Sequence, residues 1–163
     1  MSRSLFLCLM TLLACGCKAE DPRRHFEKEG GFSFVPPEGW EMKSGDSLKY
    51  KLATGPVSQG VPVNLQVVDR PFPGTVDDFV RSIVRPLSMT LPDANIVKRE
   101  TFQAYKDLHG IKMVIEVGEV RQSCYFFGKG PNKFMVTGTS PTREAARFEP
   151  IFDATLKTFR FDP

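Results

Sequence analysis

The sequence contains little of what marks several common functional classes. Only 2 histidines and 4 cysteines occur among 163 residues, and there is no HExxH, CxxC or glycine-rich phosphate-binding motif. Lys and Arg (22 residues) nearly balance Asp and Glu (19 residues) without a basic tract, whereas nucleic-acid binding depends on concentrated positive charge. We therefore expect no metal, no cofactor, no nucleic-acid partner and no catalytic residues of a recognisable class.

Long hydrophobic runs are also scarce. After residue 17, no segment approaches the roughly eighteen uninterrupted apolar residues that a membrane-spanning helix needs. The remaining composition is that of a folded domain, with 41% hydrophobic residues, 25% charged residues and 14 Phe to build a core. We expect one globular domain without extensive disorder.

The first seventeen residues are typical of a secretory signal. Residues 1–4 (MSRS) are positive, and residues 5–14 (LFLCLMTLLA) are mostly apolar. Ten helical residues span about 15 Å, half of the roughly 30 Å hydrocarbon core, so this segment is too short for a permanent anchor. Residues 12–15 (LLAC) resemble the bacterial lipobox, which predicts removal of residues 1–14 and lipidation of Cys15. The alternative is a plain secretory signal in which Cys15 is incidental.

The location follows from this lipobox. We expect a bacterial cell-envelope lipoprotein that is attached to a membrane by acyl chains such as palmitate and faces the periplasm or the exterior. Residues 18–30 are charged and poor in aliphatic side chains, which predicts that residues 15–30 form a lipidated flexible tether. Residues 31–163 then form a single domain.

The cysteines allow one disulfide in the mature protein. Once Cys8 leaves with the signal and Cys15 takes the lipid, Cys17 and Cys124 are left. An oxidising compartment permits a bond between them. The alternative is a buried thiol at Cys124.

Alternating apolar residues predict strands through most of the domain. They fall at residues 31–35, from Trp40, and at 48–52, 61–68, 94–102, 111–120, 122–127 and 133–139. Thr75 is the expected N-cap of a helix that Pro86 ends or kinks. A second helix opens at residues 140–142 and packs apolar residues between 148 and 159 on the sheet, and a short closing strand follows. The pattern predicts an α+β fold.

Two segments carry a resemblance to a known family. Residues 31–40 (GFSFVPPEGW) and residues 148–161 (FEPIFDATLKTFRF), with the strand-rich centre between them, resemble the PsbP-like group. That group includes extrinsic subunits of photosystem II, the Ran-binding protein Mog of yeast and bacterial DcrB-type lipoproteins. The resemblance implies an antiparallel β-sheet flanked by helices, an α/β/α sandwich of binding and accessory proteins without catalytic residues. The lipoprotein branch fits Cys15 best.

Candidate site residues are few. Trp40, Phe126 and Phe127 could line a ligand cleft, although packing in the core is the stronger interpretation for aromatic residues near turns. Cys124 and His109 could form a thiol dyad, but neither has a partner at a recognisable spacing. The favoured hypothesis is a lipid-anchored, noncatalytic accessory or binding module for an envelope protein or a small ligand. The alternative is a secreted hydrolase or thiol enzyme whose site is assembled in space.

Overall fold

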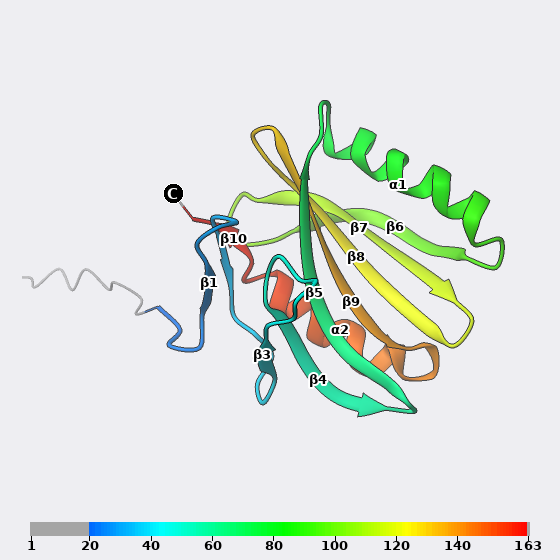
Figure 1. The fold of residues 1–163 in the computed structure, drawn as a ribbon, viewed down its shortest axis with the longest axis horizontal. Helices are drawn as coiled ribbons and strands as arrows, with labels where there is room; N and C mark the ends of the chain where they lie inside the picture. Colours follow the sequence, from blue (N-terminus) through cyan, green and yellow to red (C-terminus); the bar gives the residue numbers. More distant parts are fainter. Residues whose placement is uncertain (1–19, 163) are drawn as a thin grey trace, which may run out of the picture.

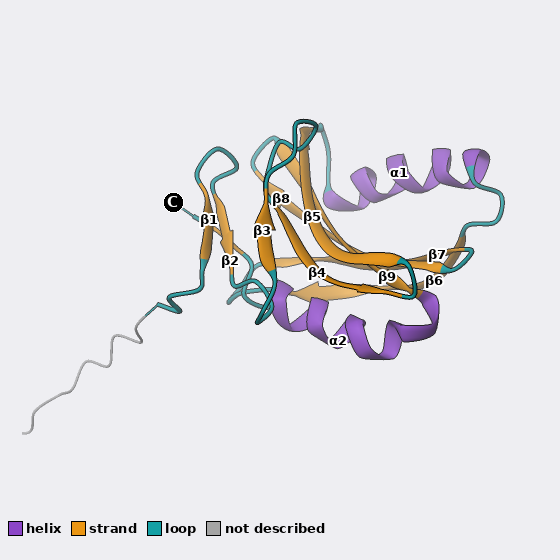
Figure 2. Ribbon diagram, turned by 60° about the horizontal axis from the view of Figure 1, so that its bottom comes forward, coloured by secondary structure: helices purple, strands orange, loops and turns teal. Residues whose placement is uncertain are grey.

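The computed structural model describes residues 20–162, which form an antiparallel sheet with one helix on each face (Figures 1 and 2). The sheet has seven strands in the order β3-β4-β5-β9-β8-β7-β6. The strands are β3 (Glu41–Lys43), β4 (Leu52–Ser58), β5 (Val61–Pro71), β6 (Asn95–Gln103), β7 (His109–Val117), β8 (Val120–Lys129) and β9 (Asn132–Pro141). The expected α+β fold is confirmed.

Helix α1 (Val76–Thr90) covers one face, and helix α2 (Ala145–Leu156), which follows a short 3-10 turn at Thr142–Glu144, covers the other (Figure 2). Strand alternation supplies both faces. In β8, Tyr125 and Phe127 pack in the core beneath α2, whereas Cys124 and Phe126 pack in the core beneath α1. Because both faces are covered, nearly every residue in the middle of β8 is buried.

A second, three-stranded antiparallel sheet lies at the end of the molecule opposite α1 (Figure 1). It contains β1 (His25–Glu27), β2 (Phe32–Phe34) and β10 (Arg160–Phe161) in the order β1-β2-β10. Phe32 joins this sheet to the main core, because its ring contacts Tyr50, Phe134 and Phe159.

The predicted tether needs a correction at this small sheet. Residues 25–27 pair with β2 through the register His25 to Phe34 and Glu27 to Phe32, so the fold begins before residue 31. The charged composition of this segment conceals the strand, since its backbone pairs with β2 while most of its side chains remain partly exposed.

Three other local predictions differ from the structure. Tyr50 is buried but precedes β4, which begins at Leu52. Of the two outcomes expected at Pro86, an end of the helix is wrong, because α1 continues to Thr90. The turn between β7 and β8 lies at Gly118, whose φ of 58° favours glycine, rather than near Arg121.

Within residues 20–162, neither helix is long and apolar enough to cross a membrane. The predicted signal, together with Cys15 and Cys17, lies outside the described residues.

Candidate functional site

A cleft of about 600 Å³ opens between α1 and the edge of the main sheet. Its apolar lining comes from Val80 and Val84 of α1, Ile96 of β6 and Met113 of β7. Val80 and Met113 are each only 1% exposed, whereas Ile96 is 42% exposed. The cleft therefore has a buried floor and an open outer edge at β6, the last strand of the sheet.

The fully buried residues of α1 lie near its beginning, and its later apolar residues are only partly buried or exposed. Near the beginning, Phe79 is 3% exposed and its ring lies 6.0 Å from that of Phe126. Past the C-terminal end of the cleft, Met89 is 80% exposed and Leu91 42% exposed. The last residues of α1 therefore take no part in the core beneath the helix.

A bulge in β6 places both an apolar and a cationic residue in the cleft. Ile96 and Arg99 are three positions apart, and such residues in a regular strand lie on opposite faces. The pairing register shifts between Ile96 and Lys98, so Ile96 lies opposite Ile115 and Arg99 lies opposite Met113. Both partners belong to the core beneath α1, and Ile96 and Arg99 therefore share that face.

The rim of the cleft is mainly cationic. It contains Arg81, Arg85 and Arg99, with the carboxylate of Asp78 in the lining and that of Asp77 in contact with Arg99. Arg81 is 65% exposed and forms an ion pair with Asp78 three residues earlier, and Arg99 forms one with Asp77. Exposed pairs of this kind contribute little to stability, about 0–1 kcal/mol each, so the guanidinium groups of Arg81 and Arg99 can exchange their carboxylate for another anion.

Asp78 also fixes the start of α1. Thr75 caps the helix, and its hydroxyl and backbone N–H both donate to the Asp78 carboxylate, at 2.7 and 2.9 Å. These hydrogen bonds, followed by the one from Arg81, lower the pKa of Asp78 to about 2. The carboxylate is therefore ionised near neutral pH and holds the first turn that supports the cleft.

A second groove, of about 540 Å³, lies between α2 and the segment that joins β2 to β3. Trp40, Pro37 and Ile151 line it, and Asp21 and Arg23 occupy its edge. These two charges pair with each other at 2.8 Å. Glu38 also lines this groove, so its charged residues are mainly acidic, whereas those of the α1 cleft are mainly cationic.

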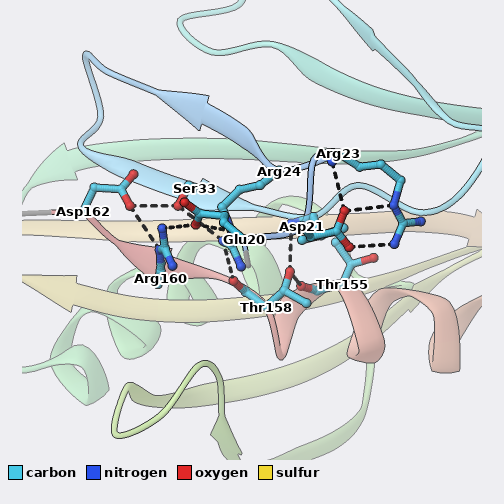
Figure 3. A network of polar contacts seen from close by, with 10 residues as sticks. Glu20, Asp21, Arg23, Arg24, Ser33, Thr155, Thr158, Arg160 and Asp162 are labelled. Atoms are coloured by element: carbon cyan, nitrogen blue, oxygen red, sulfur yellow. Dashed lines mark hydrogen bonds and ion pairs between the residues drawn. The ribbon is translucent and has the colours of Figure 1, made fainter. Parts of the chain in front are cut away.

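Figure 3 shows the polar contacts that hold residues 20–24 against the small sheet and the end of α2. The Arg24 side chain is 7% exposed and donates to the Thr158 carbonyl oxygen at 3.0 Å. Arg160 forms ion pairs with Glu20 and Asp162. We call residues 20–24 with these partners the N-terminal clasp. It attaches the start of the described chain to the body of the domain.

The three aromatic residues predicted to line a cleft do not come together. Phe126 and Phe127 are fully buried on opposite faces of β8, as the core interpretation expects. Trp40 does line a groove, the one beside α2. Its ring packs so closely on Gly55 that a Cβ there would lie 2.5 Å from a ring carbon.

Cys124 and His109 are also apart. The register of β7 and β8 places Cys124 opposite Met113, whereas His109 lies at the exposed start of β7 and pairs with Gln103. Burial raises the pKa of the Cys124 thiol to about 11, so the thiol is protonated at neutral pH. Within residues 20–162, no group of three or more potential metal ligands occurs.

Sequence reasoning missed the cleft and its arginines. One signal was available: Arg81 and Arg85 are four residues apart, as are Val80 and Val84, so α1 carries an apolar and a cationic stripe side by side. No comparable pattern in the sequence indicated that Ile96 and Arg99 of β6 both line the cleft. Simple alternation assigns them to opposite faces, and the bulge brings them to the same face.

Solved structures match this architecture over most of the chain, although no protein-family model and no curated protein matches the sequence. The solution structure of the PsbP protein CyanoP from Synechocystis sp. PCC 6803 has a TM-score of 0.62 at 14% identity, over 92% of this chain and 98% of that one. The fold is PsbP-like.

Two other solved structures share this fold. PA94 of Pseudomonas aeruginosa, a protein of unknown function described as a putative regulator, has a TM-score of 0.60 at 14% identity, over 86% of this chain and 96% of that one. LpqN of Mycobacterium tuberculosis, involved in cell envelope biogenesis, has a TM-score of 0.59 at 10% identity, over 81% and 83% of the two chains. Identities this low establish the shared fold and leave function to the site.

Proposed function

We propose that this protein is a lipid-anchored, noncatalytic binding module of the bacterial cell envelope, and that the α1 cleft holds its ligand. One observation carries the proposal: an apolar, partly enclosed cleft of about 600 Å³ has three arginines converging on its rim. Small-molecule sites are typically apolar concavities of about 300–1,000 Å³ with a few convergent polar groups.

The comparisons support the envelope part of the proposal. LpqN, which shares the fold, is involved in cell envelope biogenesis. An envelope location also agrees with the signal-like start of this chain and with the lipobox that ends at Cys15.

The N-terminal clasp constrains how such an anchor would orient the domain. If the fold is held from Glu20 onward, only residues 15–19 separate the lipidated cysteine from the clasp, and a chain of that length reaches at most about 17 Å. A lipid on Cys15 would therefore keep the small sheet beside the membrane. Helix α1 lies at the opposite end of the molecule (Figures 1 and 2), so the cleft would open away from the bilayer.

Site-specific photocrosslinking tests the proposal. We would place benzoylphenylalanine at Ile96, inside the cleft, and at Val57 of β4 as a matched control. Both residues are exposed apolar strand positions, 42% and 71% exposed, and lie in the last strand at one edge of the main sheet and the second strand from the other edge. We expect a discrete light-dependent adduct in intact cells at position 96 and none at position 57.

Equal adducts at both positions, or none at either, would contradict binding at the cleft. The enzyme hypothesis has its own readout. Labelling of the native protein by a thiol- or serine-directed probe that reaches one label per chain and disappears on unfolding would replace the binding module with an enzyme.

A further inference from the structure

We propose that the ligand of the α1 cleft is a single-chain amphiphile with an anionic head group, the chemistry of a long-chain fatty acid taken up as a monomer. This inference rests on the proposed function, because it names the ligand class of the same cleft. It follows from how apolar and cationic groups are arranged around the cleft.

The apolar part of the cleft is a continuous strip. Val80 and Val84 lie one turn apart on α1 and face Met113 and Ile96 of the sheet. Ile96, which is 42% exposed, carries this apolar surface to the open edge of the cleft. A flexible alkyl chain can follow such a strip, and each buried methylene tightens its binding about fourfold.

The cationic part lies along one edge of this strip. Arg81 and Arg85 lie one turn apart on α1, and Arg99 faces them from β6. Guanidinium groups bind carboxylates and phosphates through paired N–H donors. Together with Asp77, which contacts Arg99, the cleft brings three arginines to two carboxylates, so it favours an anionic head and disfavours a cationic one.

The cleft is better suited to binding a single amphiphile molecule than to contacting a membrane surface. The apolar residues on the floor, Val80 and Met113, are 1% exposed, so an alkyl chain has to enter between α1 and the sheet to contact them. A flat bilayer would contact the outer edge of the cleft without reaching this floor.

Envelope membranes that contain the full-length protein provide the test. A photoreactive dodecanoate probe is added, and the labelled peptides are mapped by mass spectrometry. We expect labelling on peptides from α1 and β6, and no labelling on peptides from α2, which lines the other groove. Labelling chiefly at α2 would overturn the proposal.

Competition experiments then distinguish the contribution of the head group to binding from that of the alkyl chain. We expect dodecanoate to displace the probe, and dodecylamine and dodecyl maltoside to fail, at equal free concentrations. Octanoate should compete far more weakly, because four fewer methylenes are buried at about fourfold each. Displacement by phosphatidylglycerol vesicles as efficient as that by dodecanoate would overturn uptake of a free monomer.

Variants test the arginines. Arg81→Gln and Arg99→Gln should each weaken labelling about tenfold, the loss expected for one charge-assisted hydrogen-bonding group. Arg147→Gln is the matched control, since Arg147 of α2 is also 65% exposed and also pairs with a carboxylate three residues earlier, that of Glu144. Unchanged labelling of the Arg81 and Arg99 variants would overturn the role of the cationic rim.

The two proposals fail in different ways. If dodecyl maltoside competes as well as dodecanoate does, the anionic head group is wrong, but binding at the cleft stands. If crosslinking through position 96 also gives no adduct, the proposed function fails as well.

Discussion

Lys112 shows how one residue depends on elements that are far apart in sequence. It lies in β7 and is only 1% exposed, and its ammonium group contacts Glu149 at 2.8 Å and Asp153 at 2.7 Å, both in α2. Tyr125 of β8, whose pKa burial raises well above its usual range, donates to the same Asp153 oxygen at 2.6 Å. This network ties α2 to the centre of the sheet.

Lys112→Met should destabilise the protein by about 3 kcal/mol. The methionine keeps most of the apolar stem of the lysine side chain. The decrease in the free energy of unfolding therefore measures the loss of the ammonium group that contacts Glu149 and Asp153. We expect the low end of the range for broken buried pairs because the two carboxylate side chains are 20% and 31% exposed. Chemical denaturation measures the change.

Lys98→Met provides the control for this prediction. Lys98 lies in the neighbouring strand β6 and pairs with Glu100, but its side chain is 50% exposed, so its loss should cost less than about 1 kcal/mol. Equal stability of the Lys98 and Lys112 variants would mean that the buried network contributes nothing beyond an exposed pair.

Cys124 gives a prediction about pH. Its pKa is about 11 in the folded protein against an ordinary value of 9.0, so between these values the folded state holds a proton that the unfolded state has released. Its contribution to stability is therefore complete below pH 9 and is lost as the pH rises towards 11. At pH 8, we expect thiol reagents to modify Cys124 only after unfolding.

Peptide mapping separates Cys124 from the other cysteines in that experiment. Rapid modification of native Cys124 at pH 8 would show an accessible thiolate and would count in favour of the thiol-enzyme hypothesis.

At the scale of elements, the two helices have different roles. Helix α2 carries Phe148, Phe152 and Leu156, each at most 2% exposed, into the core beneath it. Helix α1 places Phe79 and Val80 in a smaller core and lines the cleft with its neighbouring stripe. One helix therefore mainly supports the fold, whereas the other also forms the site.

Truncation after Ser140 should consequently prevent folding. It removes α2 and Phe159, and with them four large buried side chains at about 1.5–3 kcal/mol each, which rivals the 5–15 kcal/mol net stability of a typical domain. Circular dichroism during heating should show no cooperative transition. A truncated product that melts cooperatively would refute the prediction.

At the scale of the whole molecule, the clasp and the cleft lie at opposite ends. Cys15→Ser should block both lipidation and signal removal, because the modified cysteine defines the cleavage site. Globomycin-sensitive processing and labelling with a palmitate analogue measure the two steps. Cys17→Ser is the control and should be processed like the wild type; an unlabelled wild-type protein cleaved elsewhere would contradict the anchor.

The sequence by itself determined most of the elements. Alternation and turn residues located β5 to β9 within a few residues, and Thr75 marked the start of α1. These features depend on neighbours in the chain, which is why a local pattern reveals them. The segments at residues 31–40 and 148–161 also indicated the PsbP-like fold that the solved structures confirm.

Only the tertiary structure decided what lies beside what. Residues 25–27 look like a charged tether until β2 offers a partner for their backbone. Lys112 looks like a solvent-facing residue of an alternating strand until α2 covers it. Ile96 and Arg99 share the cleft because of a bulge that alternation does not reveal. In each case, the deciding contact joins distant parts of the chain, so no local pattern could have specified it.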